Sequence, residues 1–421
     1  MQRTLRLVAL AFATLIALTV AACGGGGGSG GGTASAAASN GNVSNTPNTN
    51  TAATAHAANV APITVDNGVS GVPNMPFVSV TICVPGTANC QTIDHVLVDT
   101  GSWGLRLFAS QLGSAAALPQ QTDASGNPLA ECMQFFDGYT WGPVRLGDVK
   151  ISGETANALP VQIIDPNYAA VPASCANTGT SRNTPAALAA NGILGIGVFK
   201  HDCGAACAQQ ALAGTYYACS GTTCSSIAVE ERLQVANPVP YFSADNNGVI
   251  VSLPSIAQSG AASVSGQLIF GIGTASNNGI GSATVMTVDA MRGVFTTSEN
   301  GTTYGSSFID SGSTGLFFST NQMPACVSPN SDYYCPPSTT QFSAINRGAN
   351  GATSAVTFSV GNASTIAQTR AGAAALPLLA GPAFVNSSVF DWGLPFFYGR
   401  NVYAAIEQQS TPGGVGPYFA Y

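Results

Sequence analysis

The sequence predicts an all-β protein built as two β-rich lobes that share one site. Of the 421 residues, 49 are Gly and 24 are Pro, and only 7% are charged, which is typical of many short strands joined by tight turns. The roughly 360 residues that follow the N-terminal segment exceed what one hydrophobic core usually spans. One sequence motif also occurs twice, once in each half of this region.

The first 23 residues predict a lipoprotein signal peptide. Arg3 and Arg6 precede an apolar run over residues 7–22, which is too short to span a membrane comfortably. The run ends in Val-Ala-Ala-Cys23, which resembles a bacterial lipobox, so we expect Cys23 to be acylated and the protein to be an exported lipoprotein. The residue after the cysteine is Gly24 and not Asp, which is consistent with transport of the lipoprotein to the outer membrane. The alternative is an ordinary signal peptide or a short anchor.

Residues 24–62 predict a flexible tether because they are rich in Gly, Ala, Ser, Thr and Asn and have no apolar periodicity. After the tether we expect an N-terminal lobe over residues 63–240 and a C-terminal lobe over residues 241–421.

Alternating apolar residues predict strands within the first lobe. We expect residues 77–83 and 92–98 to form a hairpin and residues 144–151 and 159–164 to form two later strands. Short helices are expected at residues 185–191 and 205–212.

The duplicated motif places an aspartate on a turn after an apolar strand. Its copies occupy residues 97–105 and 308–316, and each reads two apolar residues, Asp, a small hydroxyl residue, Gly, Ser, a variable residue and Gly-Leu. A single Asp-Thr-Gly or Asp-Ser-Gly is usually a structural turn. Two copies with the same flanks indicate one site to which each lobe contributes a carboxylate.

Asp99 and Asp310 are therefore the candidate catalytic residues. Two carboxylates about 3 Å apart cannot both ionise, so such a pair holds one proton and titrates as a unit. The ionised member can take a proton from water while the other donates to the substrate oxygen. Neighbouring glycines allow close backbone approach and neighbouring hydroxyls can hold the carboxylates coplanar, so the supporting residues are Thr100, Gly101, Ser102, Ser311, Gly312 and Ser313.

Two further segments follow the aspartate motifs in order, Asn-Gly-Ile-Leu-Gly-Ile-Gly at residues 191–197 and Trp-Gly-Leu-Pro-Phe-Phe at residues 392–397. With the aspartate motifs, they make the chain resemble the pepsin-like aspartic peptidases over most of its length after residue 70. The resemblance implies a bilobal pepsin-like fold with a central cleft, a peptide or protein substrate, no cofactor and a monomer. The chain is also similar to a group of uncharacterised bacterial lipoproteins of the DUF3443 type.

The resemblance also implies a hairpin flap over the cleft, for which residues 132–142 are the candidate. Phe135 or Phe136 would take the place of the family's flap tyrosine, and Tyr139 is a substitute from the hairpin tip. The alternative is an aromatic hairpin that packs on its own lobe. Arg106 replaces a frequent tryptophan; its guanidinium either points inward and favours ionisation of the aspartates or points to solvent.

The chain has 11 cysteines, and acylation of Cys23 leaves an even number in an exported protein, so disulfides are the default. Cys83 with Cys90 and Cys326 with Cys335 bracket short loops, and Cys132 and Cys175 remain for each other. Cys203, Cys207, Cys219 and Cys224 pair as neighbours, nest as 203–224 and 207–219, or form a four-thiolate zinc site.

The remaining composition excludes several function classes. The formal net charge is −7 and Lys150 and Lys200 are the only lysines, which argues against nucleic-acid binding. His56, His95 and His201 are too scattered for a metal site or a Ser-His-Asp triad, so we expect no metal.

Two functions fit these observations. The first is an envelope-anchored aspartic endopeptidase in which Asp99 and Asp310 activate water. The alternative is a catalytically silent binding protein of the cell envelope with the same fold, which the altered flap and Arg106 would suit.

Overall fold

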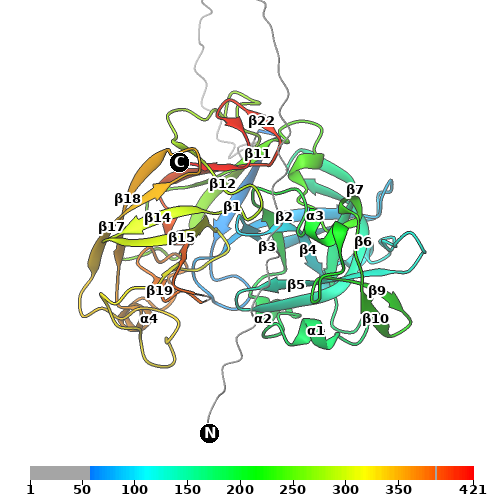
Figure 1. The fold of residues 1–421 in the computed structure, drawn as a ribbon, viewed down its shortest axis with the longest axis horizontal. Helices are drawn as coiled ribbons and strands as arrows, with labels where there is room; N and C mark the ends of the chain where they lie inside the picture. Colours follow the sequence, from blue (N-terminus) through cyan, green and yellow to red (C-terminus); the bar gives the residue numbers. More distant parts are fainter. Residues whose placement is uncertain (1–56, 385) are drawn as a thin grey trace, which may run out of the picture. The chain divides into compact units, whose positions relative to one another are not determined.

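Strands are the main secondary structure of the computed structural model, which describes residues 57–384 and 386–421 (Figure 1). The strands form two large sheets and one small hairpin, so the prediction of an all-β, two-lobed chain is confirmed. The predicted signal peptide, the lipidation residue Cys23 and most of the predicted tether lie outside the described residues.

The larger sheet has 15 strands. In spatial order they are β10 (Thr223–Ser226), β9 (Tyr216–Ser220), β5 (Leu129–Phe135), β6 (Gly138–Ile151), β7 (Glu154–Ile164), β4 (Trp103–Phe108), β8 (Gly192–Ile196), β3 (Cys90–Asp99), β2 (Pro76–Cys83), β1 (Val60–Val65), β12 (Val264–Phe270), β11 (Gly248–Leu253), β21 (Arg400–Ala405), β24 (Tyr418–Ala420) and β13 (Val285–Thr287).

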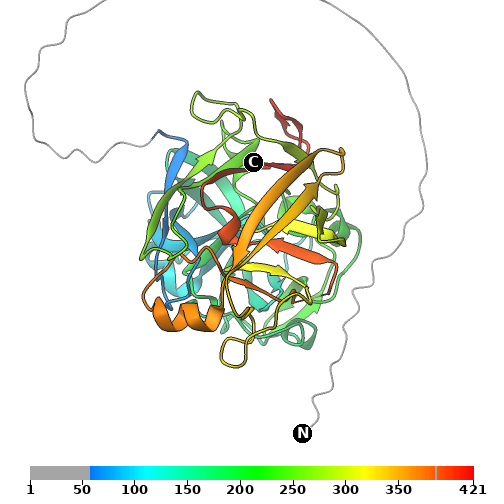
Figure 2. The same cartoon turned by 90° about the vertical axis from the view of Figure 1, so that its left-hand side faces the viewer.

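The second sheet has seven strands, all from the C-terminal half. In spatial order they are β18 (Thr353–Val360), β17 (Thr340–Arg347), β14 (Phe295–Glu299), β15 (Thr302–Ile309), β20 (Val389–Trp392), β16 (Leu316–Phe318) and β19 (Ala380–Gly381). The small hairpin pairs β22 (Ser410–Thr411) with β23 (Gly414–Val415). Figure 2 brings the long β17–β18 hairpin toward the viewer.

The helices are short. The α-helices are α1 (Ala173–Ala176), α2 (Pro185–Leu188), α3 (Ala205–Gln209) and α4 (Ala363–Thr369). The 3-10 turns are η1 (Ala109–Gln111), η2 (Gly113–Ala115), η3 (Glu231–Leu233), η4 (Val239–Tyr241) and η5 (Leu394–Phe396). None of these described helices combines the length and the apolar character that a membrane crossing needs.

Strand β1 connects the two halves of the chain within the larger sheet. It pairs antiparallel with β12 over its whole length, from Val60 opposite Ile269 to Val65 opposite Val264, and its C-terminal end pairs with β2. Val60 and Ala61 are buried in this sheet. The prediction that the tether reaches residue 62 is therefore wrong, because apolar burial begins at Val60.

The strands expected from alternation are confirmed. β2 and β3 form the predicted hairpin, with Cys83 opposite Cys90, and β6 and β7 are the two later strands. The expected helices are present as α2 and α3, and both are shorter than predicted.

The hydrophobic core differs in composition between the two sheets. Under β2, β4 and β7 it is mainly aliphatic, with side chains such as Val80, Leu105 and Val161. Beneath the second sheet it is aromatic, and Phe390 stacks against both Phe318 and Trp392, with ring centroids 4.6 and 4.2 Å apart. Flat stacked rings bury a large area with few rotatable bonds, so they form a rigid packed layer beneath the second sheet.

Five disulfides staple the loops of the described chain: Cys83–Cys90, Cys132–Cys175, Cys203–Cys207, Cys219–Cys224 and Cys326–Cys335. The predicted local bridges and the Cys132–Cys175 pair are confirmed. The four central cysteines pair as neighbours, so the nested and zinc-thiolate alternatives are wrong. Their sulfur atoms are already bonded to each other and are not free thiolates.

We predict that removing Cys132–Cys175 destabilises the protein more than removing Cys83–Cys90. The first bridge closes a sequence separation of 43 and the second a separation of only 7. Loop-closure entropy then gives a loss of about 4 kcal/mol for Cys132→Ala/Cys175→Ala and about 2 kcal/mol for Cys83→Ala/Cys90→Ala. Equilibrium unfolding in urea measures both losses. The reverse order would show that native-state packing around the bridges outweighs chain entropy.

Candidate active site

The two predicted aspartates occupy the same topological position in the two halves of the chain. Asp99 ends β3, which runs parallel to β8, and β4 returns antiparallel along the other side of β8. Asp310 follows β15, which runs parallel to β20, and β16 returns antiparallel along β20. Residues 192–195 of the first predicted apolar segment therefore pair with β3, and Trp392, which begins the second segment, pairs with Ile309 on β15.

The two carboxyl groups lie next to each other because the facing positions are glycines. A Cβ atom on Gly101 would lie 2.5 Å from the carboxyl carbon of Asp310, and one on Gly312 would lie 2.9 Å from that of Asp99. Real Cβ atoms do not approach other atoms so closely, so any side chain here would push the carboxyl groups apart. The glycines are required by this close approach.

Each carboxylate is held by its own loop. For Asp99, the backbone N–H of Gly101 donates to Oδ1 at 2.8 Å and the hydroxyl of Ser102 donates to Oδ2 at 2.5 Å. These two bonds fix both oxygens of a carboxylate that is buried from solvent.

The second loop repeats this arrangement. The N–H of Gly312 donates to Asp310 Oδ1 at 2.7 Å, and the hydroxyl of Ser313 donates to Asp310 Oδ2 at 2.8 Å. Matched donors on matched oxygens place the two carboxyl groups in equivalent orientations, which is the support that the sequence predicted for Ser102 and Ser313.

Thr100 and Ser311 join the two loops to each other. The Thr100 hydroxyl donates to the carbonyl of Ile309 at 2.9 Å and accepts from the Ser311 N–H at 2.9 Å. The Ser311 hydroxyl donates to the carbonyl of Val98 at 2.7 Å and accepts from the Thr100 N–H at 3.1 Å. Both hydroxyls are buried and fully used, so they hold the loops together and do not contact the carboxylates.

The environment makes one carboxyl group hard to ionise. Burial raises the pKa of Asp310 well above its usual range, and the neighbouring charges of Asp99 and Asp391 raise it further, against a lowering by the Ser313 hydrogen bond. The pair therefore holds a proton at pH values at which an exposed aspartate would have lost it.

Two residues beside the site were not predicted. Asp391, on β20, is only 2% exposed. Burial raises its pKa well above the usual range. Asn74 is fully buried and bonds to the carbonyl of Thr314, just after the second aspartate turn, at 2.7 Å, and to the carbonyl of Leu376 at 2.8 Å. Asp391 could have been noticed as the one charged residue in the apolar run 389–397, whereas nothing in the sequence distinguishes Asn74.

The predicted flap is the hairpin of β5 and β6, with Phe136 and Asp137 at its turn. Phe136 is 57% exposed, and its ring lies 5.8 Å from that of Phe308 on β15, so the hairpin tip touches the second half of the chain. Phe135 is half-buried at the end of β5. Tyr139 is not at the tip as expected; it lies on β6 and packs with Trp141 in its own lobe.

A match to a protein family covers residues 55–421, and the family is described as "Protein of unknown function (DUF3443)". The chain belongs to this family. No curated protein matches the chain. Among solved structures, an aspartic proteinase from Irpex lacteus is similar at 16% sequence identity and a TM-score of 0.46, over 86% of this chain and 96% of the proteinase. That likeness is too weak to carry an argument about activity.

Arg106 points neither at the aspartates nor at solvent. Its fully buried guanidinium donates to Glu131 on β5 at 2.6 Å and to Asp202 at 3.2 Å. The Tyr216 hydroxyl donates to the other oxygen of Asp202 at 2.6 Å. Arg106 therefore ties the strand after the first aspartate turn to the strand that leads into the flap.

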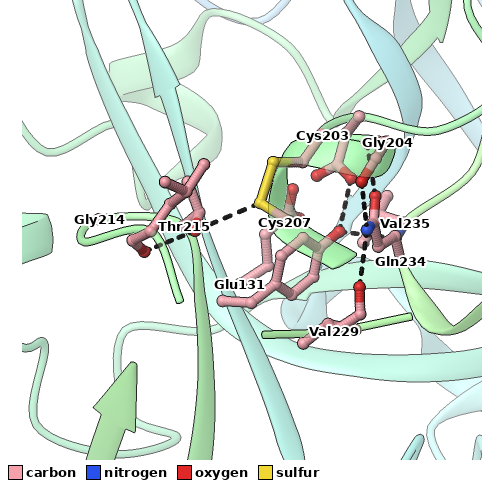
Figure 3. The surroundings of a disulfide bond; sticks show 12 residues. Glu131, Cys203, Gly204, Cys207, Gly214, Thr215, Val229, Gln234 and Val235 are labelled. Carbon is pink, nitrogen blue, oxygen red and sulfur yellow. Dashed lines mark hydrogen bonds between the residues drawn. A yellow bond between two sulfur atoms is a disulfide. The ribbon is translucent and has the colours of Figure 1, made fainter. Parts of the chain in front are cut away.

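This buried cluster contains one cation and two carboxyl groups. Burial, together with the charge of Glu131, raises the pKa of Asp202 well above its usual range, so Asp202 holds its proton to higher pH than an exposed aspartate would. The loop that carries Asp202 is fixed by the Cys203–Cys207 disulfide and by Gln234, whose side chain bonds both to the N–H and to the carbonyl of Gly204 (Figure 3).

We predict that Gly101→Ala destabilises the protein by about 1–3 kcal/mol, because the new methyl group would overlap the Asp310 carboxyl group. Gly305→Ala on β15 is the matched control, since a Cβ there meets nothing within 4 Å, and should change stability by less than about 0.5 kcal/mol. Chemical denaturation measures both. Equal stability of the two variants would contradict the close approach of the carboxyl groups.

We predict that Arg106→Met costs about 3–5 kcal/mol, because it leaves the buried Glu131 carboxylate without its cation. Arg232→Met is the control, since the Arg232–Glu230 pair is exposed and contributes less than about 1 kcal/mol. The double variant Arg106→Met/Glu131→Gln should recover part of the loss, as measured by urea unfolding. A loss as small as that of the control would show that the cluster is not charged.

Proposed function

We propose that the protein is an aspartic endopeptidase that hydrolyses peptide bonds with Asp99 and Asp310. The observation that carries the proposal is the pair of adjoining carboxyl groups with identical hydrogen bonding, one from each duplicated turn. A structural pair of turns has no need to place two like charges in contact, because their repulsion and burial cost stability.

The proposed chemistry divides the two roles between the carboxyl groups. Asp310 carries the shared proton, because burial and its acidic neighbours raise its pKa. Asp99, whose oxygens accept hydrogen bonds from Gly101 and Ser102, is assigned the role of general base. Asp99 takes a proton from water as the water attacks the peptide carbonyl, and Asp310 donates its proton to the carbonyl oxygen. No covalent enzyme intermediate is formed.

The position of the flap hairpin is consistent with a polymeric substrate. Phe136 crosses from the first half of the chain to Phe308, which precedes Asp310 by two residues on β15. A peptide bound at the aspartates would lie under this aromatic contact. We further infer that acylation of Cys23 anchors the enzyme, as a monomer, to the outer membrane.

We expect Asp99→Asn and Asp310→Asn each to lower peptide cleavage by about 10³-fold or more, because general acid–base catalysis needs one group in each protonation state. Asp94→Asn, at an exposed position on β3, is the matched control and should retain activity. The full chain in detergent is incubated with a diverse peptide pool from acidic to neutral pH, and products are read by mass spectrometry. The whole chain is used because β1 begins at Val60.

The pH dependence of peptide cleavage is a second test of the proposal in the same experiment. The singly protonated pair is lost as pH rises through its upper apparent pKa, so cleavage should fall on the alkaline side. Undiminished cleavage by either Asn variant would contradict the proposal. Absence of cleavage by the folded parent chain at every pH would favour a binding protein of the cell envelope.

A further inference from the structure

A third carboxyl group, that of Asp391, faces the two-aspartate site. Its neighbours on β20, Phe390 and Trp392, both lie in the hydrophobic core. Since side chains alternate along a strand, Asp391 points to the opposite face. Phe308 is its register partner on β15, and Asp310 follows two residues later, so Asp391 and Asp310 share that face.

The contacts link Asp391 to the catalytic pair. The Ser313 hydroxyl donates to Asp310 Oδ2 at 2.8 Å. Burial raises the pKa of Asp391, and the same Ser313 hydroxyl lowers it by less. The charge of Asp99 acts on Asp391, and the charge of Asp391 acts on Asp310. The three carboxyl groups therefore form one coupled set.

Nothing in the described chain neutralises this set. None of its ion pairs involves Asp99, Asp310 or Asp391. The Oδ1 atom of Asp391 is buried without a hydrogen-bond partner. A buried carboxyl group in this state costs stability, whether it is ionised or neutral.

The duplicated half shows that the fold does not require this carboxyl group. Ile193 holds the equivalent place on β8, opposite Leu97 on β3 just as Asp391 is opposite Phe308. Ile193 is equally buried, at 2% exposure. An apolar side chain thus satisfies the packing there, and the carboxyl group in the second half needs another explanation.

We propose that Asp391 is a positioning residue that acts through Asp310 and takes up the second negative charge of the site as pH rises. Its proton goes to solvent while the proton shared by Asp99 and Asp310 stays in place. The pair then remains active at higher pH than two carboxyl groups alone would allow. The inference rests on the proposed peptidase function.

The order of ionisation follows from the groups that face Asp391. The charge of Asp99 acts on Asp391, the charge of Asp391 acts on Asp310, and burial is the largest cause of the raised pKa of Asp391. Once Asp391 is ionised, removing the last proton from the pair places a third negative charge in one buried site. Like charges at this range disfavour that step strongly.

The test compares the pH profiles of cleavage by the parent chain and by Asp391→Asn, with Asp94→Asn as the control. The isosteric amide removes the charge and keeps the volume. We expect kcat/KM on the acidic side to change by less than about threefold, and the alkaline limb to move to lower pH by about one unit. An unchanged limb, or loss of activity at every pH in a variant with the parent's Tm, would overturn the proposal.

Infrared difference spectroscopy tests the coupling without turnover. The carbonyl band of protonated Asp391, identified by its loss in Asp391→Asn, should disappear at a lower pH in the double variant Asp99→Asn/Asp310→Asn than in the parent chain, because neither member of the pair can then carry a charge. An identical midpoint, or no such band in the parent chain, would overturn the inference. If the midpoint shifts in the variant but the parent chain cleaves no peptide, the proposed peptidase function is rejected, and the electrostatic coupling of Asp391 to the two aspartates is retained.

Discussion

The reciprocal hydrogen bonds between Thr100 and Ser311 are the constraint on which the site depends. Each hydroxyl donates to a carbonyl of the other loop and accepts its N–H, so four bonds cross between segments more than 200 residues apart in sequence. Removing one hydroxyl would leave a buried N–H and a buried carbonyl unpaired, at about 1–3 kcal/mol each. This cost opposes the repulsion between the two carboxyl groups, and it keeps them adjacent.

The loops can be held this way because each is backed by a rigid sheet. Leu194 and Trp392 occupy equivalent places beside Val98 and Ile309, and both are fully buried. The backing differs in chemistry: it is aliphatic under Asp99 and a stack of aromatic rings under Asp310. The same topology therefore positions the same carboxyl group with two different cores, which shows that register rather than side-chain identity sets the geometry.

The two halves also treat buried charge differently. Arg106 in the first half is paired with Glu131 and Asp202, and the pKa of Asp202 is raised, so the cluster links β4 to β5 with its charges partnered. Asp391 in the second half lies in a set of carboxyl groups without a cation partner in the described chain. A compensated cluster is expected to be structural, whereas an uncompensated carboxyl group beside the proposed catalytic pair is expected to tune it.

The sequence by itself determined the features that are local. Alternation over residues 77–83 and 92–98 predicted the hairpin that delivers Asp99, and the repeated Asp-hydroxyl-Gly-Ser turns predicted the candidate site and its glycines. Short loop spacings predicted Cys83–Cys90 and Cys326–Cys335. These features follow from period-two burial, turn chemistry and chain connectivity, all of which act over a few residues.

Only the tertiary structure decided which distant residues meet. The choice between neighbouring and nested cysteine pairs, the burial of Arg106 against Glu131, the packing of Tyr139 into its own lobe, and the approach of Asp391 to Asp310 all depend on strand register and sheet order. Shifting a strand by one residue would move such a side chain to the other face, and a single sequence carries no local signal of that register. The carboxyl pair could therefore be predicted from its turns, but the groups that govern its protons could not.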